Sequence, residues 1–173
     1  KRKAPESIRN IAALADDETR GEPLLARLDQ TTDPSARSRI LVEIGITMNE
    51  GLDDPEQALE ALLEAWRSDP LNEEVLDHLE PIVRKQDKWF DLMEQTRALA
   101  GAERVAARSL AYHEAMVRWL TREKPDPALA RAWVDRIKVI DATHALVHYV
   151  QAALSREHGD LKREVDELDL AVL

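Results

Sequence analysis

Apolar residues recur every three or four positions along most of this chain, the spacing that places them on one face of an α-helix. The longest uninterrupted pattern covers residues 102 to 123, where Val105, Tyr112, Met116 and Trp119 share a stripe. The pattern therefore predicts an all-α protein without β-strands.

Residues that favour helix ends divide this pattern into ten helices. Asp54-Pro55 supplies an N-cap followed by proline at the first helical position, and Gly51 ends the helix before it. Asp87 is expected to cap the helix that follows it, and Pro81 to break or kink a helix near Glu80. Paired in order, the ten helices make five hairpins. They are predicted over residues 4–15, from 23 onward, and over 35–50, 55–68, 72–86, 87–101, 102–123, 127–140, 143–158 and 160–172.

The chain also repeats itself. Asp-Pro pairs at 33–34 and 69–70 are 36 residues apart, and those at 54–55 and 126–127 are 72 apart. The 72-residue offset also relates Ala58, Leu62, Ala65, Trp89 and Met93 to Ala130, Val134, Ile137, Leu161 and Val165. Repetition at such a period is typical of stacked helical hairpins, which usually hold other proteins. We therefore expect a right-handed α-superhelix of about five hairpins.

The segment from residue 40 to 70 resembles the tetratricopeptide-repeat family. Ala58, Leu62, Ala65 and Pro70 fit the second helix of that repeat. The family's tryptophan, leucine, glycine and tyrosine positions of the first helix fall on Ile40, Glu43, Ile44 and Thr47, which do not match, with Gly51 in the turn. The resemblance implies a divergent α-solenoid and a protein-binding role, and other α-solenoid repeats remain open.

Composition sets wider limits. The 173 residues suit one domain, residues 1–173, and the absence of an initial methionine suggests a fragment of a longer protein. Without cysteine there are no disulfides or thiolate metal sites, whereas the compartment stays open, with the cytoplasm slightly favoured. Charges interrupt every apolar run, so we expect no membrane insertion.

Acidity is concentrated in one hairpin. Residues 50–80 contain eleven acidic residues and one arginine, a net charge of −10 that equals the charge of the whole chain. This acidic patch is either a solvated helix face or a docking surface that attracts a basic protein or peptide. Its candidate residues are Glu56, Glu60, Glu64, Glu73, Glu74 and Asp77.

A second candidate site follows from the family resemblance alone. In that family the first helix of each pair lines a concave groove that binds a partner segment. The resemblance implies groove positions at Arg37, Glu43, Thr47, Arg108, Tyr112, His113, His144, His148 and Gln151.

Motifs for chemistry are absent or incomplete. His113-Glu114 begins like a zinc-protease helix, but Val117 stands where the second histidine is needed. His144 and His148 lie one helical turn apart, and we interpret them as part of a polar face, not as metal ligands. There is no glycine-rich phosphate loop and no dense basic stripe, which argues against a cofactor and against nucleic-acid binding. The four tryptophans are expected in the core.

The sequence as a whole predicts a protein-binding scaffold or adaptor without catalytic activity. The alternatives are a structural or self-associating segment of a larger repeat protein, and a regulatory domain fused to an enzyme. A mild basic excess over residues 97–138 could meet the acidic patch of another copy.

Overall fold

A computed structural model describes residues 21–157 and 159–172 of the chain. These residues form helices and contain no strand, so the all-α prediction is confirmed for them. The first expected helix, residues 4–15, lies outside the described residues. The chain divides into two compact units, the first ending at Lys88 and the second beginning at Trp89, and each is described by itself.

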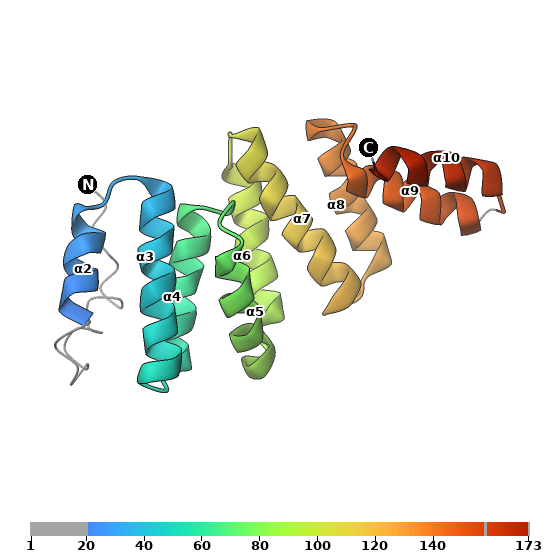
Figure 1. Ribbon diagram of the computed structural model, residues 1–173. Helices are drawn as coiled ribbons and strands as arrows, with labels where there is room; N and C mark the ends of the chain where they lie inside the picture. Colours follow the sequence, from blue (N-terminus) through green and yellow to red (C-terminus); the bar gives the residue numbers. More distant parts are fainter. Residues whose placement is uncertain (1–20, 158, 173) are drawn as a thin grey trace. The chain divides into compact units, whose positions relative to one another are not determined.

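The first unit is built around one antiparallel helical hairpin. Its elements are α2 (Gly21–Gln30), α3 (Pro34–Ile46), the π-helical turn η1 (Thr47–Gly51), α4 (Pro55–Ser68) and α5 (Glu74–Gln86). Helices α3 and α4 pack side by side, with α2 against α3 and α5 against α4 (Figure 1). The wide turn of η1 accommodates the longer connection before α4 and ends at Gly51, as predicted.

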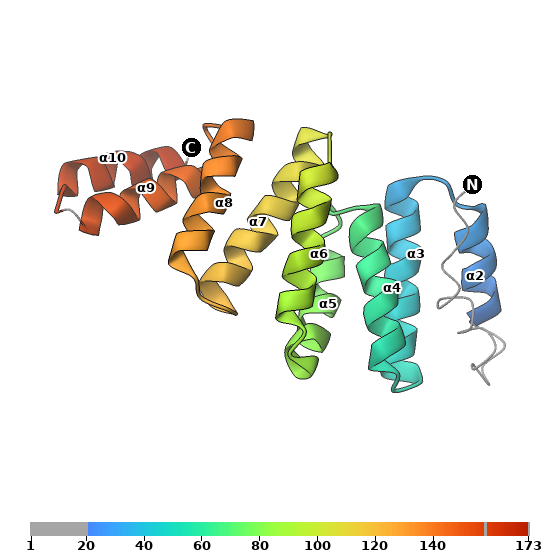
Figure 2. The ribbon, with the colours of Figure 1, turned by 180° about the vertical axis from the view of Figure 1, so that it is seen from behind.

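The second unit contains two antiparallel hairpins. Its helices are α6 (Trp89–Ala102), α7 (Ala106–Arg122), α8 (Pro127–Ile140), α9 (Ala145–Glu157) and α10 (Leu161–Val172). Helix α7 packs between α6 and α8, and α9 packs on both α8 and α10 (Figure 2). The predicted pairings of α3 with α4, α7 with α8 and α9 with α10 are therefore present.

The offset of 72 residues recurs in the backbone geometry of the two units. Asp54 caps α4 by accepting a hydrogen bond from the Gln57 N–H at 3.1 Å, and Asp126 caps α8 by accepting one from the Leu129 N–H at 2.9 Å. Proline follows each cap, where its missing N–H costs no helical hydrogen bond. Both helices contain 14 residues.

Both helices also end in the same way. The backbone is extended at Asp69 and at Asp141, which follow α4 and α8, and each side chain accepts a hydrogen bond from an N–H two residues later. These donors are Leu71 at 3.1 Å and Thr143 at 2.9 Å. Hydrogen bonds from Thr143, chiefly from its hydroxyl, lower the pKa of Asp141. Local hydrogen bonds of this kind fix the turn that leads into the next helix.

The ends of α5 and α9 continue the correspondence. Asp87 and Gly159 both have positive φ, 51° and 74°. The following residues, Lys88 and Asp160, donate backbone hydrogen bonds of 3.0 and 2.9 Å to Val83 and Ser155 respectively. This left-handed turn is a common helix C-terminus. The predicted role of Asp87 was therefore wrong in part, since its backbone ends α5.

Two other expectations differ from the structure. Helix α5 runs through Pro81 without a break. Helix α6 continues past Gly101, and α7 begins only at Ala106, because Glu103 organises the connection. Its carboxylate accepts hydrogen bonds from the N–H groups of Arg104 and Val105 and from Arg108 Nε at 2.9 Å. These bonds, chiefly the one from Arg108, lower the pKa of Glu103. Val105 consequently lies at the cap and is 55% exposed, not on the apolar stripe.

The tryptophans form the centre of the packing. Trp66, Trp89, Trp119 and Trp133 are all buried, which confirms their predicted place in the core. In the second unit the Trp89 and Trp119 ring centroids are 6.0 Å apart, a separation typical of tilted aromatic pairs. Among the described helices, none is both long and apolar enough to cross a bilayer.

Candidate functional site

The acidic patch lies on α4 and around the start of α5. All its members except Glu64 are exposed. Glu56, Glu74 and Asp77 lie in the first turns of these helices, where the helix dipole stabilises a negative charge. Part of the acidity therefore stabilises local structure as well as setting the sign of the surface.

Glu64 does not belong to the exposed row predicted from the sequence. It is only 7% exposed, and its carboxylate accepts a 3.4 Å hydrogen bond from Arg67 Nη1. A step of four residues turns a helix by about 400°, so a row at i, i+4 and i+8 drifts by about 40° per step. Glu56 and Glu60 still face solvent, whereas the third position reaches the edge of the packed face.

The predicted groove positions of the first unit have separate roles. Arg37 is buried, and its Nη1 donates a 3.2 Å hydrogen bond to the Leu28 carbonyl. Glu43 is exposed and pairs with Arg27 at 3.2 Å. The Thr47 hydroxyl donates to the carbonyl of Glu43 at 2.8 Å. These contacts stabilise α2 and α3, and the burial of Arg37 removes it from any partner surface.

Tyr112 and His113 are buried in the second unit, which corrects their expected place in an open groove. The His113 ring meets the Trp133 ring edge-on at 4.9 Å, and its Nδ1 lies 2.7 Å from the Ser109 carbonyl oxygen. Because α7 packs between α6 and α8, its polar residues meet neighbouring helices instead of a ligand. Arg108 is committed to its ion pair with Glu103.

The remaining three groove candidates connect helices. His144 Nε2 lies 2.6 Å from Glu114 Oε1, and His148 Nδ1 lies 2.8 Å from Glu167 Oε2. With its amide oriented to satisfy both neighbours, Gln151 donates to Glu167 at 3.1 Å and accepts from Lys138 Nζ at 3.2 Å. The two histidines thus hold carboxylates. No group of three His, Cys, Asp or Glu residues suited to a metal occurs within the described residues.

Burial chiefly lowers the pKa of His113, and the charge of Arg136 adds to the effect. The folded chain therefore takes up this proton less readily than the unfolded chain, whose histidine has a pKa of about 6.5. We expect the free energy of unfolding to fall as the pH is lowered from 8 through this range. In His113→Gln this contribution to the pH dependence should vanish, and in Arg136→Gln it should shrink.

Denaturant unfolding at pH 8 and at pH 5.5 measures the effect, as the change in unfolding free energy between the two conditions. An identical change in the parent chain and in His113→Gln would contradict the burial argument.

An apolar groove, which sequence periodicity did not indicate, lies on the second unit between α6, α7 and α8. Its volume is about 670 Å³. Buried side chains form its floor, and the exposed Phe90 and Leu129 stand at its edge. Charges of both signs complete the rim. The apolar groove is lined by Phe90, Met93, Met116, Leu120, Leu129 and Trp133, with Glu94, Arg97, Glu123, Lys124 and Asp126 around them.

This groove has the properties of a binding surface. Phe90 is 70% exposed, and the Lys124 ammonium lies 5.6 Å from its ring centroid. The unbranched side chains of Met93 and Met116 can adapt to different apolar partners. A concave surface with an apolar floor and a charged rim suits a peptide side chain.

Comparison with known proteins gives no further identification, because no family model, curated protein or solved structure matches this chain.

Proposed function

We propose that this chain is a protein-interaction module that binds a segment of a partner protein. The apolar groove carries the proposal, because an aromatic side chain as exposed as Phe90, beside a concave apolar floor, is typical of an interaction site. The segment supplies a large apolar anchor residue. No catalytic step or cofactor forms part of the proposal.

The acidic patch gives the partner its sign. Its exposed carboxylates attract lysine and arginine side chains, which raises the association rate and makes binding sensitive to salt. The partner segment therefore carries basic residues as well as an apolar anchor.

The repeated caps and turns support a finer proposal for the architecture. A unit that recurs after 72 residues with the same helix starts and ends can be stacked, and stacking of helical hairpins produces a solenoid. We propose a right-handed superhelix of the tetratricopeptide type as the arrangement of the whole chain.

Selection from a random peptide display library tests the proposed function with a defined probe. Peptides enriched on the parent chain should carry an aromatic or aliphatic anchor together with lysine or arginine. Phe90→Ser combined with Leu129→Ser should weaken their binding by about tenfold or more, since two apolar contacts are lost. Val139→Ser is the matched control, because Val139 is 88% exposed on α8 and does not line the groove.

A second pair of variants tests the acidic patch. Glu60→Lys with Glu74→Lys should weaken the same peptides, whereas Asp166→Lys with Asp169→Lys, an equal change of charge on α10, should not. Enriched peptides that lack basic residues, or equal binding by both pairs, would reject steering by the patch. Failure of the groove variants to weaken binding would reject the groove.

A structural segment that associates with further repeats is the second candidate function. Val165 and Leu170 are exposed apolar side chains on α10, and such side chains are what an additional helix would cover. Concentration-dependent dimer formation in analytical ultracentrifugation, abolished by Val165→Ser with Leu170→Ser, would favour it over the groove.

A further inference from the structure

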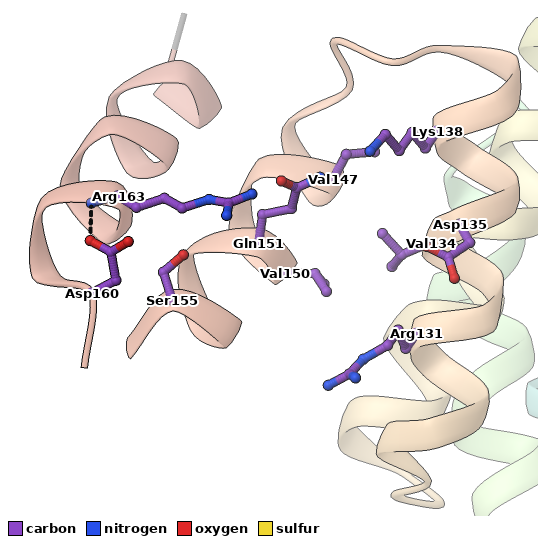
Figure 3. A pocket seen from close by; sticks show the side chains of 10 residues that line it. All are labelled: Arg131, Val134, Asp135, Lys138, Val147, Val150, Gln151, Ser155, Asp160 and Arg163. Carbon is purple, nitrogen blue, oxygen red and sulfur yellow. Dashed lines mark hydrogen bonds between the residues drawn. The ribbon is translucent and has the colours of Figure 1, made fainter. Parts of the chain in front are cut away.

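A second pocket lies on a different side of α8, between that helix and the hairpin of α9 and α10. Its volume is about 470 Å³. Figure 3 shows Arg131 and Lys138 reaching from α8 and Arg163 from α10 toward the space that Val134, Val147 and Val150 line. Asp135, Gln151, Ser155 and Asp160 complete the lining.

The internal repeat shows what this place looks like when it is closed. At an offset of 72 residues, Arg131, Asp135 and Lys138 correspond to Leu59, Leu63 and Trp66 of α4. In the same way Gln151 and Ser155 of α9 correspond to Leu79 and Val83 of α5. Leu59, Trp66, Leu79 and Val83 are buried, and α4 packs on α5. The first unit thus fills with apolar side chains the interface that the second unit lines with polar ones.

The polar residues of the second unit are not explained by packing. A lysine in place of a buried tryptophan, and an arginine and an aspartate in place of leucines, forgo apolar burial at three positions of one helix face. Such a loss within an otherwise repeated interface is expected where the polar groups serve a ligand.

Positive charge dominates the pocket. Three cations face two carboxylates, of which Asp160 accepts the Arg163 N–H at 3.1 Å as the cap of α10. Asp135 lies between Arg131 and Lys138 on α8, and within the described part of the chain neither Arg131 nor Asp135 forms an ion pair or a hydrogen bond. The surplus of positive charge occurs in a chain whose net charge is −10.

The cations also keep hydrogen-bonding capacity. The closest carboxylate to Arg163 is that of Glu167, 3.9 Å from Nε, which is longer than a hydrogen bond. Glu167 already receives His148 and Gln151. A guanidinium has five N–H donors, and two guanidiniums with an ammonium suit the oxygens of a carboxylate.

We propose that this pocket binds a glutamate-containing peptide segment. Arg131, Lys138 and Arg163 hold the carboxylate, and the valines contact the aliphatic part of the side chain. The proposal does not depend on the apolar groove, which uses Leu129 and Trp133 on another side of α8.

Calorimetric titration of the full chain tests the proposal with a peptide of alternating glutamate and alanine. The same peptide with glutamine in place of glutamate is the ligand control. We expect the glutamate peptide to bind, to weaken with added salt, and to shift the methyl resonances of Val134, Val147 and Val150. Arg131→Gln with Arg163→Gln should weaken it about tenfold.

Arg122→Gln with Lys162→Gln removes the same charge outside the pocket and should leave the affinity unchanged. Phe90→Ser should also leave it unchanged, so that failure of this site and failure of the apolar groove are distinguished. Absence of glutamate-peptide binding, equal binding of the glutamine peptide, or full affinity in the double arginine variant would each overturn the proposal. Glutarate binding as tightly as the peptide would overturn the peptide assignment in favour of a small dicarboxylate.

Discussion

Replacing Trp119 with alanine should lower the free energy of unfolding of the second unit by about 3 to 5 kcal/mol, the usual cost of deleting a buried aromatic ring. Trp119 is fully buried in α7. Its ring lies beside that of Trp89, so the substitution removes the contact between two large side chains as well as its own burial. The neighbouring helices cannot collapse fully into the space left by an indole ring.

Chemical denaturation followed by circular dichroism measures this change. Phe90→Ala is the matched control, because it also deletes an aromatic ring from this unit but at an exposed position. Its effect should stay within about 0.5 kcal/mol. Equal effects of the two substitutions would contradict the placement of Trp119 at the centre of the packing.

Gly45→Ala should destabilise the first unit by about 1 to 2 kcal/mol, although alanine normally favours a helix over glycine by about 1 kcal/mol. A Cβ at Gly45 would lie 2.7 Å from Leu62 Cγ, closer than two carbon atoms can approach. Leu62 is fully buried in α4, so the side chain cannot swing away, and α3 and α4 would be forced apart. Thermal and denaturant unfolding measure the loss.

Two further variants isolate the close contact. Gly101→Ala places the same methyl group in α6, where a Cβ meets nothing within 4 Å, and it should stabilise the chain by about 0.5 to 1 kcal/mol. Leu62→Ala should cost less in the Gly45→Ala background than in the parent chain, because the new methyl group fills part of the cavity. Additive effects of the two substitutions would contradict the predicted clash.

The same contact shows where the sequence comparison lost register. The tetratricopeptide resemblance placed the glycine position of the first helix on Ile44, whereas the structure brings Gly45 against Leu62. The π-helical turn at Thr47–Gly51 takes up an additional residue before α4. Counting back from α4 along a regular helix therefore misplaces the contact by one position.

The candidate sites were only partly accessible to sequence reasoning. The charge of residues 50–80 marked the acidic patch, and only Glu64 proved to be buried. The groove positions taken from the family resemblance included Tyr112 and His113, which α7 buries. Periodicity placed Met116 and Leu120 on an apolar face, but it does not show that part of this face stays open beside the exposed Phe90.

Local chemistry alone determined the helices and their repetition. The Asp-Pro starts at residues 54 and 126 act within a few residues, so the pattern of residue types sufficed to predict them and the 72-residue offset. Only the tertiary structure decided which helix faces are filled. Leu63 and Asp135 occupy equivalent positions of α4 and α8, yet one borders a closed interface and the other an open pocket. That difference depends on side chains contributed by other helices, because burial is a property of packed neighbours and not of spacing along one helix.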